Sequence, residues 1–312
     1  MHHCGIFSFF YYINRHKRIV VTYHNVIPDH LFDNTPHLGV SHAASVFEKQ
    51  ITLLKRKISN LVITFDDGYQ NQYQIASKIL NKYGMQGVFF ITFQSIENGK
   101  TLLIDKITQW ISYVPTGTYT IYNEQYNITH ENRNPIASII YEKLLSHYFL
   151  WNTIENELNN AYLFDSLTLD NDLKKLRFTP LMPNELADLK KDGHKIAAHS
   201  WDHKPLATLP IEDQEKDFEL CQTYAKKYCN LKWYSYPYGG KKEVSIDTMR
   251  LCKQYGFSEG FTNVPTPLFD ESSVEKNYQI SRINLPNIYN ACILNAKLSG
   301  FECFLKKILQ SF

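Results

Sequence analysis

The sequence carries no marked excess of charge of either sign. Among 312 residues there are 33 lysines and arginines and 31 aspartates and glutamates, so the formal net charge is +2. There is no long basic run that could follow a phosphate backbone, and nucleic acid is therefore excluded as an expected partner. Internal repeats and low-complexity segments are also absent. Hydrophobic residues make up 44%, which is enough for the large core of one barrel-sized domain.

Disulfide signals and membrane-spanning runs are lacking as well. The six cysteines form no C-x-x-C pair, and all but Cys4 lie in the C-terminal third of the chain, which predicts reduced and mostly buried thiols. The first apolar stretch, Ile6–Ile13, is far shorter than a spanning helix, and the cations Arg15, Lys17 and Arg18 follow it instead of preceding it. The sequence therefore predicts a cytoplasmic protein with no secretory signal.

Two terminal segments flank the region 19–290. They are residues 1–18, first apolar and then basic, and a predicted C-terminal amphipathic helix at 291–312. Each can simply dock on the core, as terminal apolar residues usually do. Both are also short, aromatic and edged with cations, which in the second segment are Lys306 and Lys307. Peripheral contact with the inner membrane is therefore the alternative. No obligate protein partner can be inferred.

Short apolar runs alternate with helical periods from residue 19 to about 290. Strands are predicted at 19–23, 61–65, 88–91, 195–198, 233–236, 260–262 and 278–281. Continuous apolar strands separated by helices indicate a parallel α/β fold, either an open sheet or a closed barrel. Polar groups that follow several strands favour the barrel, because barrel enzymes build their sites at the C-terminal ends of strands.

The alternation breaks between about 98 and 180. The segment 119–128 resembles a hairpin around Asn123–Gln125, and a polar, helix-prone stretch follows it. We expect an insertion that covers one rim of the barrel. Asp105 in this insertion can contact substrate or, more simply, form a salt bridge on a helix surface.

Adjacent carboxylates, Asp66 and Asp67, follow the strand predicted at 61–65. Neighbouring side chains point in different directions, so one carboxylate can bind a metal ion while the other stays free. By itself the sequence Asp66-Asp67-Gly68 is also an ordinary turn.

A pair of histidines, His199 and His203, is spaced by four residues, which places both imidazoles on one helical turn or one tight loop. Such a pair can arise by coincidence on a surface. Together with one carboxylate, however, two imidazoles leave coordination positions open for water and substrate, as in a catalytic rather than a structural metal site.

Three motifs in this order resemble those of the polysaccharide deacetylase family, carbohydrate esterase family 4, which includes the nodulation-type chitooligosaccharide deacetylases. They are Thr64–Gly68, Gly193–His203 and Tyr236–Gly239, and the resemblance covers roughly residues 19–285. It implies a distorted barrel of seven or eight parallel strands.

The resemblance also implies roles for single residues. Asp66 would be the general base, and Asp67, His199 and His203 would hold a divalent metal ion, with Zn²⁺ expected. The backbone N–H of Tyr238 would stabilise the oxyanion. A metal ion lowers the pKa of its bound water toward about 7, so hydrolysis proceeds near neutrality.

Substrate contacts are expected from Pro237, Tyr238 and Trp201. The flanking Pro237 and Gly239 would fix the Tyr238 N–H in place, although a proline and a glycine can also mark a simple turn.

Two departures from the family pattern stand out. Many members carry an arginine two positions before the proline of the third motif, where this chain has Ser235; Arg282 is the predicted replacement, with a solvated or core-capping role as the alternative. The late histidine that serves as general acid is also missing, because the last histidine is His203. His24, directly after the first strand, is the candidate acid, although a lone histidine is more often structural.

The sequence therefore predicts a metal-dependent hydrolase that removes an acetyl or other small acyl group from a sugar. N-acetylhexosamine in exopolysaccharide or lipopolysaccharide biosynthesis is the leading substrate, and an O-acetyl ester or a formamido group on a lipid-linked sugar is the alternative. A different class of function is a sugar-binding protein that retains the fold with a weakened site.

Overall fold

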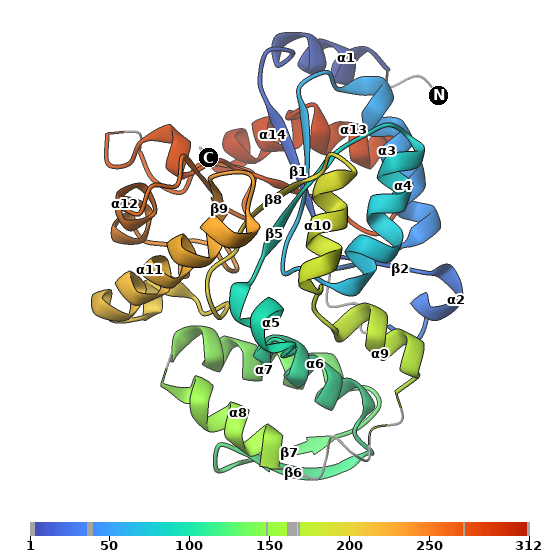
Figure 1. Ribbon diagram of the computed structural model, residues 1–312. Coiled ribbons are helices and arrows are strands. Elements are labelled where there is room, and N and C mark those ends of the chain that lie inside the picture. Colours follow the sequence, from blue (N-terminus) through green and yellow to red (C-terminus); the bar gives the residue numbers. More distant parts are fainter. Residues whose placement is uncertain are drawn as a thin grey trace.

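The structure is a computed structural model that describes residues 4–35, 40–147, 149–160, 167, 169–270 and 272–310. A curled sheet of parallel strands forms its centre, in the order β10-β9-β8-β5-β4-β1-β11 (Figure 1). The strands are β1 (Ile19–Tyr23), β4 (Leu61–Phe65), β5 (Gly87–Ile91), β8 (Lys195–Ala198), β9 (Trp233–Ser235), β10 (Glu259–Phe261) and β11 (Ile283–Asn284). The predicted distorted α/β barrel of parallel strands is confirmed.

The two edges of this sheet are joined by the stretch 280–284. Ile280 forms a parallel bridge with Phe261 of β10, and Ile283 pairs with Val21 of β1. The last strand differs from its predicted position at 278–281, because a 3₁₀ turn, η3 (Lys276–Tyr278), precedes it and delays the regular pairing. Residues 280–284 therefore lie between β1 and β10.

Helices cover the outer face of the sheet, and short elements connect it at the rims (Figure 1). These are α2 (Asp29–Phe32), α3 (Ala44–Lys57), the π-helix η1 (Gln72–Ala76), α4 (Ser77–Lys82), α10 (Pro183–Lys191), η2 (Leu206–Thr208), α11 (Ile211–Tyr228) and α12 (Ile246–Gln254), with the strand pair β2 (Asn25–Ile27) and β3 (Ser41–Ala43).

Side chains along β4 alternate between the covering helices and the barrel interior. Phe65 belongs to the large core beneath the helices, whereas Val62 packs with the smaller cluster of strand residues inside the barrel. Because successive side chains of a strand point to opposite faces, Thr64 and Asp66 point into the barrel, as Val62 does. Arg282 reaches the same interior, where its Nη1 donates to Thr64 Oγ1 at 3.3 Å. The first residue after β4 therefore projects a carboxylate into the barrel mouth.

An insertion between β5 and β8 forms a separate layer with its own apolar core at one end of the molecule (Figure 1). This core is built from α6 (Leu103–Tyr113), β6 (Gly117–Ile121), β7 (Glu124–Ile128), α7 (Arg133–Ser146) and α8 (Leu150–Asn160). The helices α5 (Phe93–Asn98) and α9 (Asn171–Phe178) connect the insertion to the barrel. The hairpin turns at Tyr122 and Asn123, whose φ angles of 51° and 58° suit a two-residue turn.

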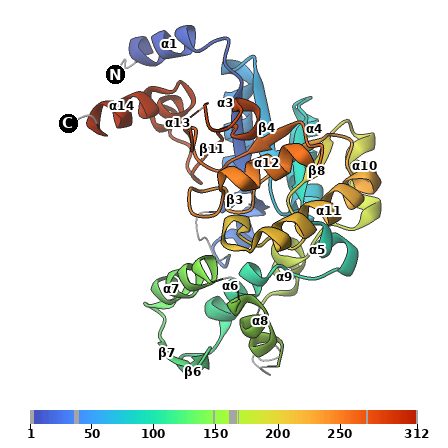
Figure 2. The same ribbon diagram turned by 90° about the vertical axis from the view of Figure 1, so that its left-hand side faces the viewer.

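The terminal segments pack against each other at the opposite end from the insertion (Figures 1 and 2). The segments form α1 (Cys4–Ile13), α13 (Ala291–Leu298) and α14 (Phe301–Gln310), so the C-terminal stretch carries two helices where the sequence suggested one. The rings of Phe10 and Phe301 lie 5.3 Å apart, and Tyr11 Oη donates to Asn295 Oδ1 at 3.0 Å. Among the described residues, no helix is both long and apolar enough to cross a membrane.

Candidate active site

Three buried side chains from two loops converge at the barrel mouth: Asp67, His199 and His203. Their potential ligand atoms all lie within 4.8 Å of one another. Asp67 Oδ1 is 3.3 Å from His199 Nε2 and 3.1 Å from His203 Nε2. The structure thus brings together the three residues that the sequence proposed as metal ligands.

The chemistry of this cluster fits a divalent cation. His199 Nδ1 lies 2.7 Å from the Ser235 carbonyl oxygen, which can only accept, so Nδ1 carries the proton and Nε2 offers its lone pair to the cluster. Asp67 Oδ1 is buried without a hydrogen-bond partner. A buried carboxylate oxygen that faces imidazole nitrogens is costly unless a proton or a metal ion lies between them.

Strained backbone conformations position these groups. Asp67, Ser200, His203 and Tyr238 have φ angles of 81°, 63°, 63° and 60°, a region that non-glycine residues rarely adopt. Such conformations cost about 1–3 kcal/mol each and persist only where the surroundings impose them. At His203 the restraint is visible, because its N–H donates to Ser200 Oγ at 2.8 Å.

A buried arginine fork holds Asp66. Arg282 Nη1 donates to Asp66 Oδ1 at 2.7 Å and Nη2 donates to Oδ2 at 2.6 Å. The predicted ion pair is therefore present, and the alternative of a solvated Arg282 is wrong, since its side chain is 0% exposed. Ser235, where the motif resemblance leads one to expect an arginine, supports the pair, because its Oγ accepts from Arg282 Nη2 at 2.9 Å.

This environment keeps Asp66 ionised. Burial by itself raises the pKa of the Asp66 carboxyl, but the charge and the hydrogen bonds of Arg282 outweigh it and hold the pKa below its usual value. A carboxylate that is ionised at neutral pH and lies beside a candidate metal site has the chemistry needed to accept a proton from a water molecule bound there.

His24 lies on the same rim of the barrel. Its Nε2 is 4.0 Å from Asp66 Oδ2, and its side chain is only 16% exposed. Burial lowers the pKa of the His24 imidazole below its usual value, and the charges of Asp67 and Asp66 offset this only in part. The ring is therefore neutral in the resting protein and lies next to the carboxylate that can collect a proton.

The third motif forms a tight turn against the cluster. Pro237 is buried, and the Tyr238 ring lies 4.8 Å from the His203 ring and also packs on the core of the insertion. A Cβ at Gly239 would come within 2.4 Å of the Asn263 backbone nitrogen, and its φ is 65°, so only glycine fits there. Among the described residues, no acceptor is found for the Tyr238 N–H.

Trp201 takes a different position from the two histidines that flank it. Its ring packs on Tyr224 at 4.8 Å, and its backbone N–H donates to Asp217 Oδ2 at 3.0 Å, on the outer side of the loop. Burial, followed by the charge of Asp202, raises the pKa of Asp217 to about 7. The structure therefore places Trp201 beside the cluster instead of within it.

Two supporting contacts escaped the sequence analysis. Gln72, at the start of the π-helix η1, donates to the backbone oxygens of His24 (2.8 Å) and Asp66 (2.5 Å) and ties the ends of β1 and β4 together. No spacing in the sequence signals this contact, because it depends on a helix register that deviates from the usual one.

The expectation of a helix-surface salt bridge at Asp105 is wrong. Asp105 is buried, and it pairs with the equally buried Arg177 at 2.9 Å and accepts from Tyr69 Oη at 2.5 Å. Burial raises the pKa of Asp105 above its usual value, although Arg177 opposes this shift. The hydrogen bond from Tyr69 links the insertion to the segment that follows the first motif.

A model of the polysaccharide deacetylase family matches residues 54–259. No curated protein matches the chain. Among solved structures, the Streptococcus pyogenes deacetylase PplD in complex with acetate is 13% identical, with a TM-score of 0.55 over 90% of this chain and 97% of the other. IcaB from Ammonifex degensii is 13% identical, with a TM-score of 0.51 over 91% and 95% of the two chains.

A third similar structure is the polysaccharide deacetylase BC0361 from Bacillus cereus. It is 12% identical, with a TM-score of 0.54 over 90% of this chain and 68% of the other. At identities this low, the three structural likenesses show a common fold, whereas the family match covers the residues from 54 to 259 that include the whole candidate metal cluster.

Proposed function

Because this chain belongs to the polysaccharide deacetylase family and is thus a carbohydrate deacetylase, we propose that it is a metal-dependent hydrolase acting on an N-acetylhexosamine of a bacterial cell-surface glycan or its lipid-linked precursor. The single observation that carries metal dependence is the convergence of Asp67, His199 and His203, with a carboxylate oxygen that lacks any other partner. Their mixed nitrogen and oxygen ligand set suits Zn²⁺.

A metal ion bound by these residues would polarise the acyl carbonyl and acidify a bound water molecule. In this proposal Asp66 takes the proton of the attacking water, and Arg282 keeps the carboxylate ionised and oriented. Water oxygen bonds to the acyl carbon, the carbon–nitrogen bond breaks, and the products are a carboxylate and an amine. A formamido group would be cleaved by the same steps, whereas in an O-acetyl ester the acyl carbon–oxygen bond would break and release an alcohol.

The Tyr238 backbone N–H is proposed to stabilise the oxyanion of the tetrahedral intermediate. The turn at Pro237 and Gly239 fixes this donor before substrate binds, so no reorganisation is needed during the reaction. In other enzymes, removal of one such donor costs about 3–4 kcal/mol of transition-state stabilisation. In this proposal Pro237 and the Tyr238 ring also contact the sugar, from the side on which the Tyr238 N–H lies.

Incubation with acetylated glycan fragments tests the proposal directly. We expect the metal-loaded protein to release one acetyl group from N-acetylated oligosaccharides, as detected by mass spectrometry of the products. Metal-loaded protein that leaves N-acetyl, O-acetyl and N-formyl probes unchanged would instead favour the sugar-binding alternative, which was motivated by the missing late histidine.

We predict that His24→Ala slows hydrolysis of an amide far more than hydrolysis of an activated ester. An amine leaves poorly without a proton, whereas an activated alcohol departs as an anion. The neutral His24 ring, 4.0 Å from Asp66, can pass on the proton that Asp66 collects. Loss of a general acid typically costs about 10²–10⁴-fold in rate.

Two measurements separate this role from a structural one. Turnover is compared on an N-acetylated sugar and on 4-nitrophenyl acetate, and the metal content of the variant is determined by elemental analysis. Equal losses of turnover on both substrates, or a loss of bound metal, would show that His24 has a structural role in the site.

We also propose that the packed terminal helices contact the inner membrane from its cytoplasmic side. Seven of the fourteen exposed large apolar residues among the described part of the chain lie on α1, α13 and α14, and we call them the terminal-helix surface. They are Ile6, Phe9, Tyr12, Ile13, Ile293, Phe304 and Leu305. The exposed cations Arg15 and Lys17 come directly after α1 in the chain. Cations next to exposed apolar residues are expected where a protein surface meets anionic lipid headgroups. The side chains of Lys306 and Lys307 lie outside the described residues.

Vesicle co-sedimentation tests this contact with a matched pair of variants. Ile13 on α1 is 48% exposed and Ile139 on α7 is 46% exposed. We expect Ile13→Glu to weaken binding to phosphatidylglycerol vesicles at least fivefold, because it places a negative charge at the interface, and Ile139→Glu to leave binding unchanged. Identical behaviour of both variants, or wild-type protein that stays in the supernatant, would mean that the terminal helices simply dock on the core.

A further inference from the structure

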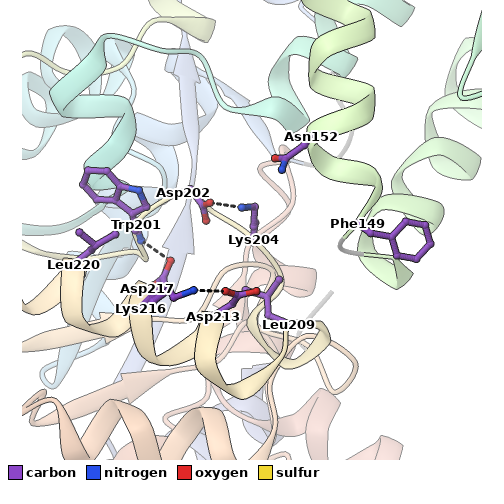
Figure 3. Close-up of a pocket in the computed structure, with 10 residues that line it drawn as sticks. All are labelled: Phe149, Asn152, Trp201, Asp202, Lys204, Leu209, Asp213, Lys216, Asp217 and Leu220. Atoms are coloured by element: carbon purple, nitrogen blue, oxygen red, sulfur yellow. Dashed lines mark hydrogen bonds and ion pairs between the residues drawn. The ribbon is translucent and has the colours of Figure 1, made fainter.

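A groove of about 510 Å³ lies between the insertion and the loop that carries the two histidines (Figure 3). Asn152 of α8 forms one wall, the loop residues Trp201, Asp202 and Lys204 form another, and α11 forms the floor. The volume falls within the range of about 300–1,000 Å³ that is usual for small-molecule sites. The groove therefore has room for a sugar ring.

The lining of the groove suits a neutral polyhydroxyl ligand. Lys204 Nζ lies 2.7 Å from Asp202 Oδ2, and Lys216 Nζ lies 3.1 Å from Asp213 Oδ1, so each cation already has its counter-charge (Figure 3). An anionic ligand would have to break one of these pairs, and the third lining carboxylate, Asp217, already accepts a hydrogen bond from the Trp201 backbone N–H. Ammonium, carboxylate and Asn152 amide groups together offer both donors and acceptors, which is what hydroxyl groups require.

The histidine loop presents different residues on its two sides. His199 and His203 point toward Asp67, whereas Trp201, Asp202 and Lys204 line the groove. Asp202 and Lys204 flank His203 in the sequence, so the groove borders the candidate metal site but contains none of its three residues. This position suits a neighbouring unit of a glycan chain better than the unit whose acyl group is hydrolysed.

From this geometry we propose that the groove is a subsite for a second sugar unit of the glycan, so that the insertion selects oligosaccharides over single sugars. This proposal rests on the proposed function, because it takes the substrate to be a glycan. The groove exists only because α8 of the insertion stands over α11 and the histidine loop of the barrel (Figure 3). Binding energy from such a remote unit can be used to orient the reacting one.

A matched pair of variants on α8 tests the subsite. Asn152 and Asn156 are both exposed and lie one helical turn apart, but only Asn152 lines the groove. We expect Asn152→Trp to fill part of the groove and lower kcat/KM at least tenfold, through KM, on N-acetylglucosamine oligomers of about three to five units. On N-acetylglucosamine itself and on 4-nitrophenyl acetate, Asn152→Trp should match the wild type. Asn156→Trp should match it on every substrate.

Equal effects of Asn152→Trp on all substrate lengths, or no difference between the two variants, would overturn the subsite. Calorimetric binding of the same oligomers to Asp66→Asn protein tests the groove without turnover: we expect the additional Asn152→Trp change to weaken binding at least tenfold. If wild-type protein hydrolyses none of the oligomers, the proposed function fails, and the calorimetry still decides the subsite, since absence of binding at millimolar concentration would contradict it.

Discussion

Asp66→Asn is expected to lower turnover by roughly 10² or more while the protein keeps its full complement of metal. The amide has the shape of the carboxylate but cannot accept the proton of the attacking water. The three proposed metal ligands are left untouched, so metal content measured on the purified variant should equal that of the wild type.

The substitution also has a structural cost that must be separated from its chemical one. Arg282 is 0% exposed, and Asp66 provides its two shortest hydrogen bonds. Removal of one partner of a buried ion pair typically destabilises a protein by about 3–5 kcal/mol. Thermal unfolding of the variant therefore accompanies the activity assay.

Asp105→Asn supplies the matched control, because it removes the carboxylate of a second buried pair, with Arg177, outside the metal cluster. It should destabilise the protein by a similar order of free energy and leave turnover close to that of the wild type. Asp66→Asn protein with wild-type turnover would remove Asp66 from the mechanism, and equal activity losses in the two variants would reduce its role to stability.

The pH dependence of stability follows from the same pair. The pKa of Asp66 is held below its usual value in the folded protein, so the pair stabilises the fold above the unfolded-state pKa of about 3.9. That contribution is lost as the pH falls through the lower folded-state pKa. The difference in unfolding free energy between wild type and Asp66→Asn should accordingly be full at neutral pH and shrink in strong acid.

Alanine at Asp67, His199 or His203 is expected to abolish stoichiometric metal binding in each case. Three protein ligands leave no redundancy in a site that must keep positions open for water and substrate. Activity should fall to the background rate, and added Zn²⁺ should raise the melting temperature of the wild type but not of the variants. At a free metal concentration of 100 times Kd, this stabilisation amounts to about 2.7 kcal/mol.

His194→Ala is the control for these three variants. His194 is a buried histidine beside the start of β8, where its Nδ1 accepts the Gly87 N–H at 3.1 Å, and it lies outside the metal cluster. Its replacement should lower stability without releasing metal. Full metal occupancy in any of the three ligand variants, or metal loss in His194→Ala, would show that the ion is held elsewhere.

Much of the fold and the candidate site could be predicted because the signals are local. The run 61–65 predicts a strand by its apolar side chains, and β4 occupies those residues. Asp66 and Asp67 are adjacent in the sequence, and His199 and His203 are four residues apart, so short-range geometry alone restricts where their side chains can go. The family motifs also lie within such short segments.

Other features were misplaced or missed because their signals are not local. The last strand was predicted to begin five residues too early, since the turn η3 and the pairing with two distant strands decide where it begins. Asp105 was expected in a salt bridge on a helix surface, but it is buried with Arg177 and Tyr69. Helical periodicity gives no indication of either partner.

The sequence by itself determined the parallel α/β architecture, the two loops that carry the candidate ligands, and Arg282 as a possible partner for Asp66. Only the tertiary structure decided that Arg282 and Asp66, which are 216 positions apart, meet in a bidentate pair, and that the insertion stands over the histidine loop to form a groove. The physical reason is that strand formation and turn geometry depend on neighbouring residues. Barrel closure and the position of the insertion depend on contacts between segments that are far apart in the sequence. The local pattern of one segment gives no information about which other segment it will pack against.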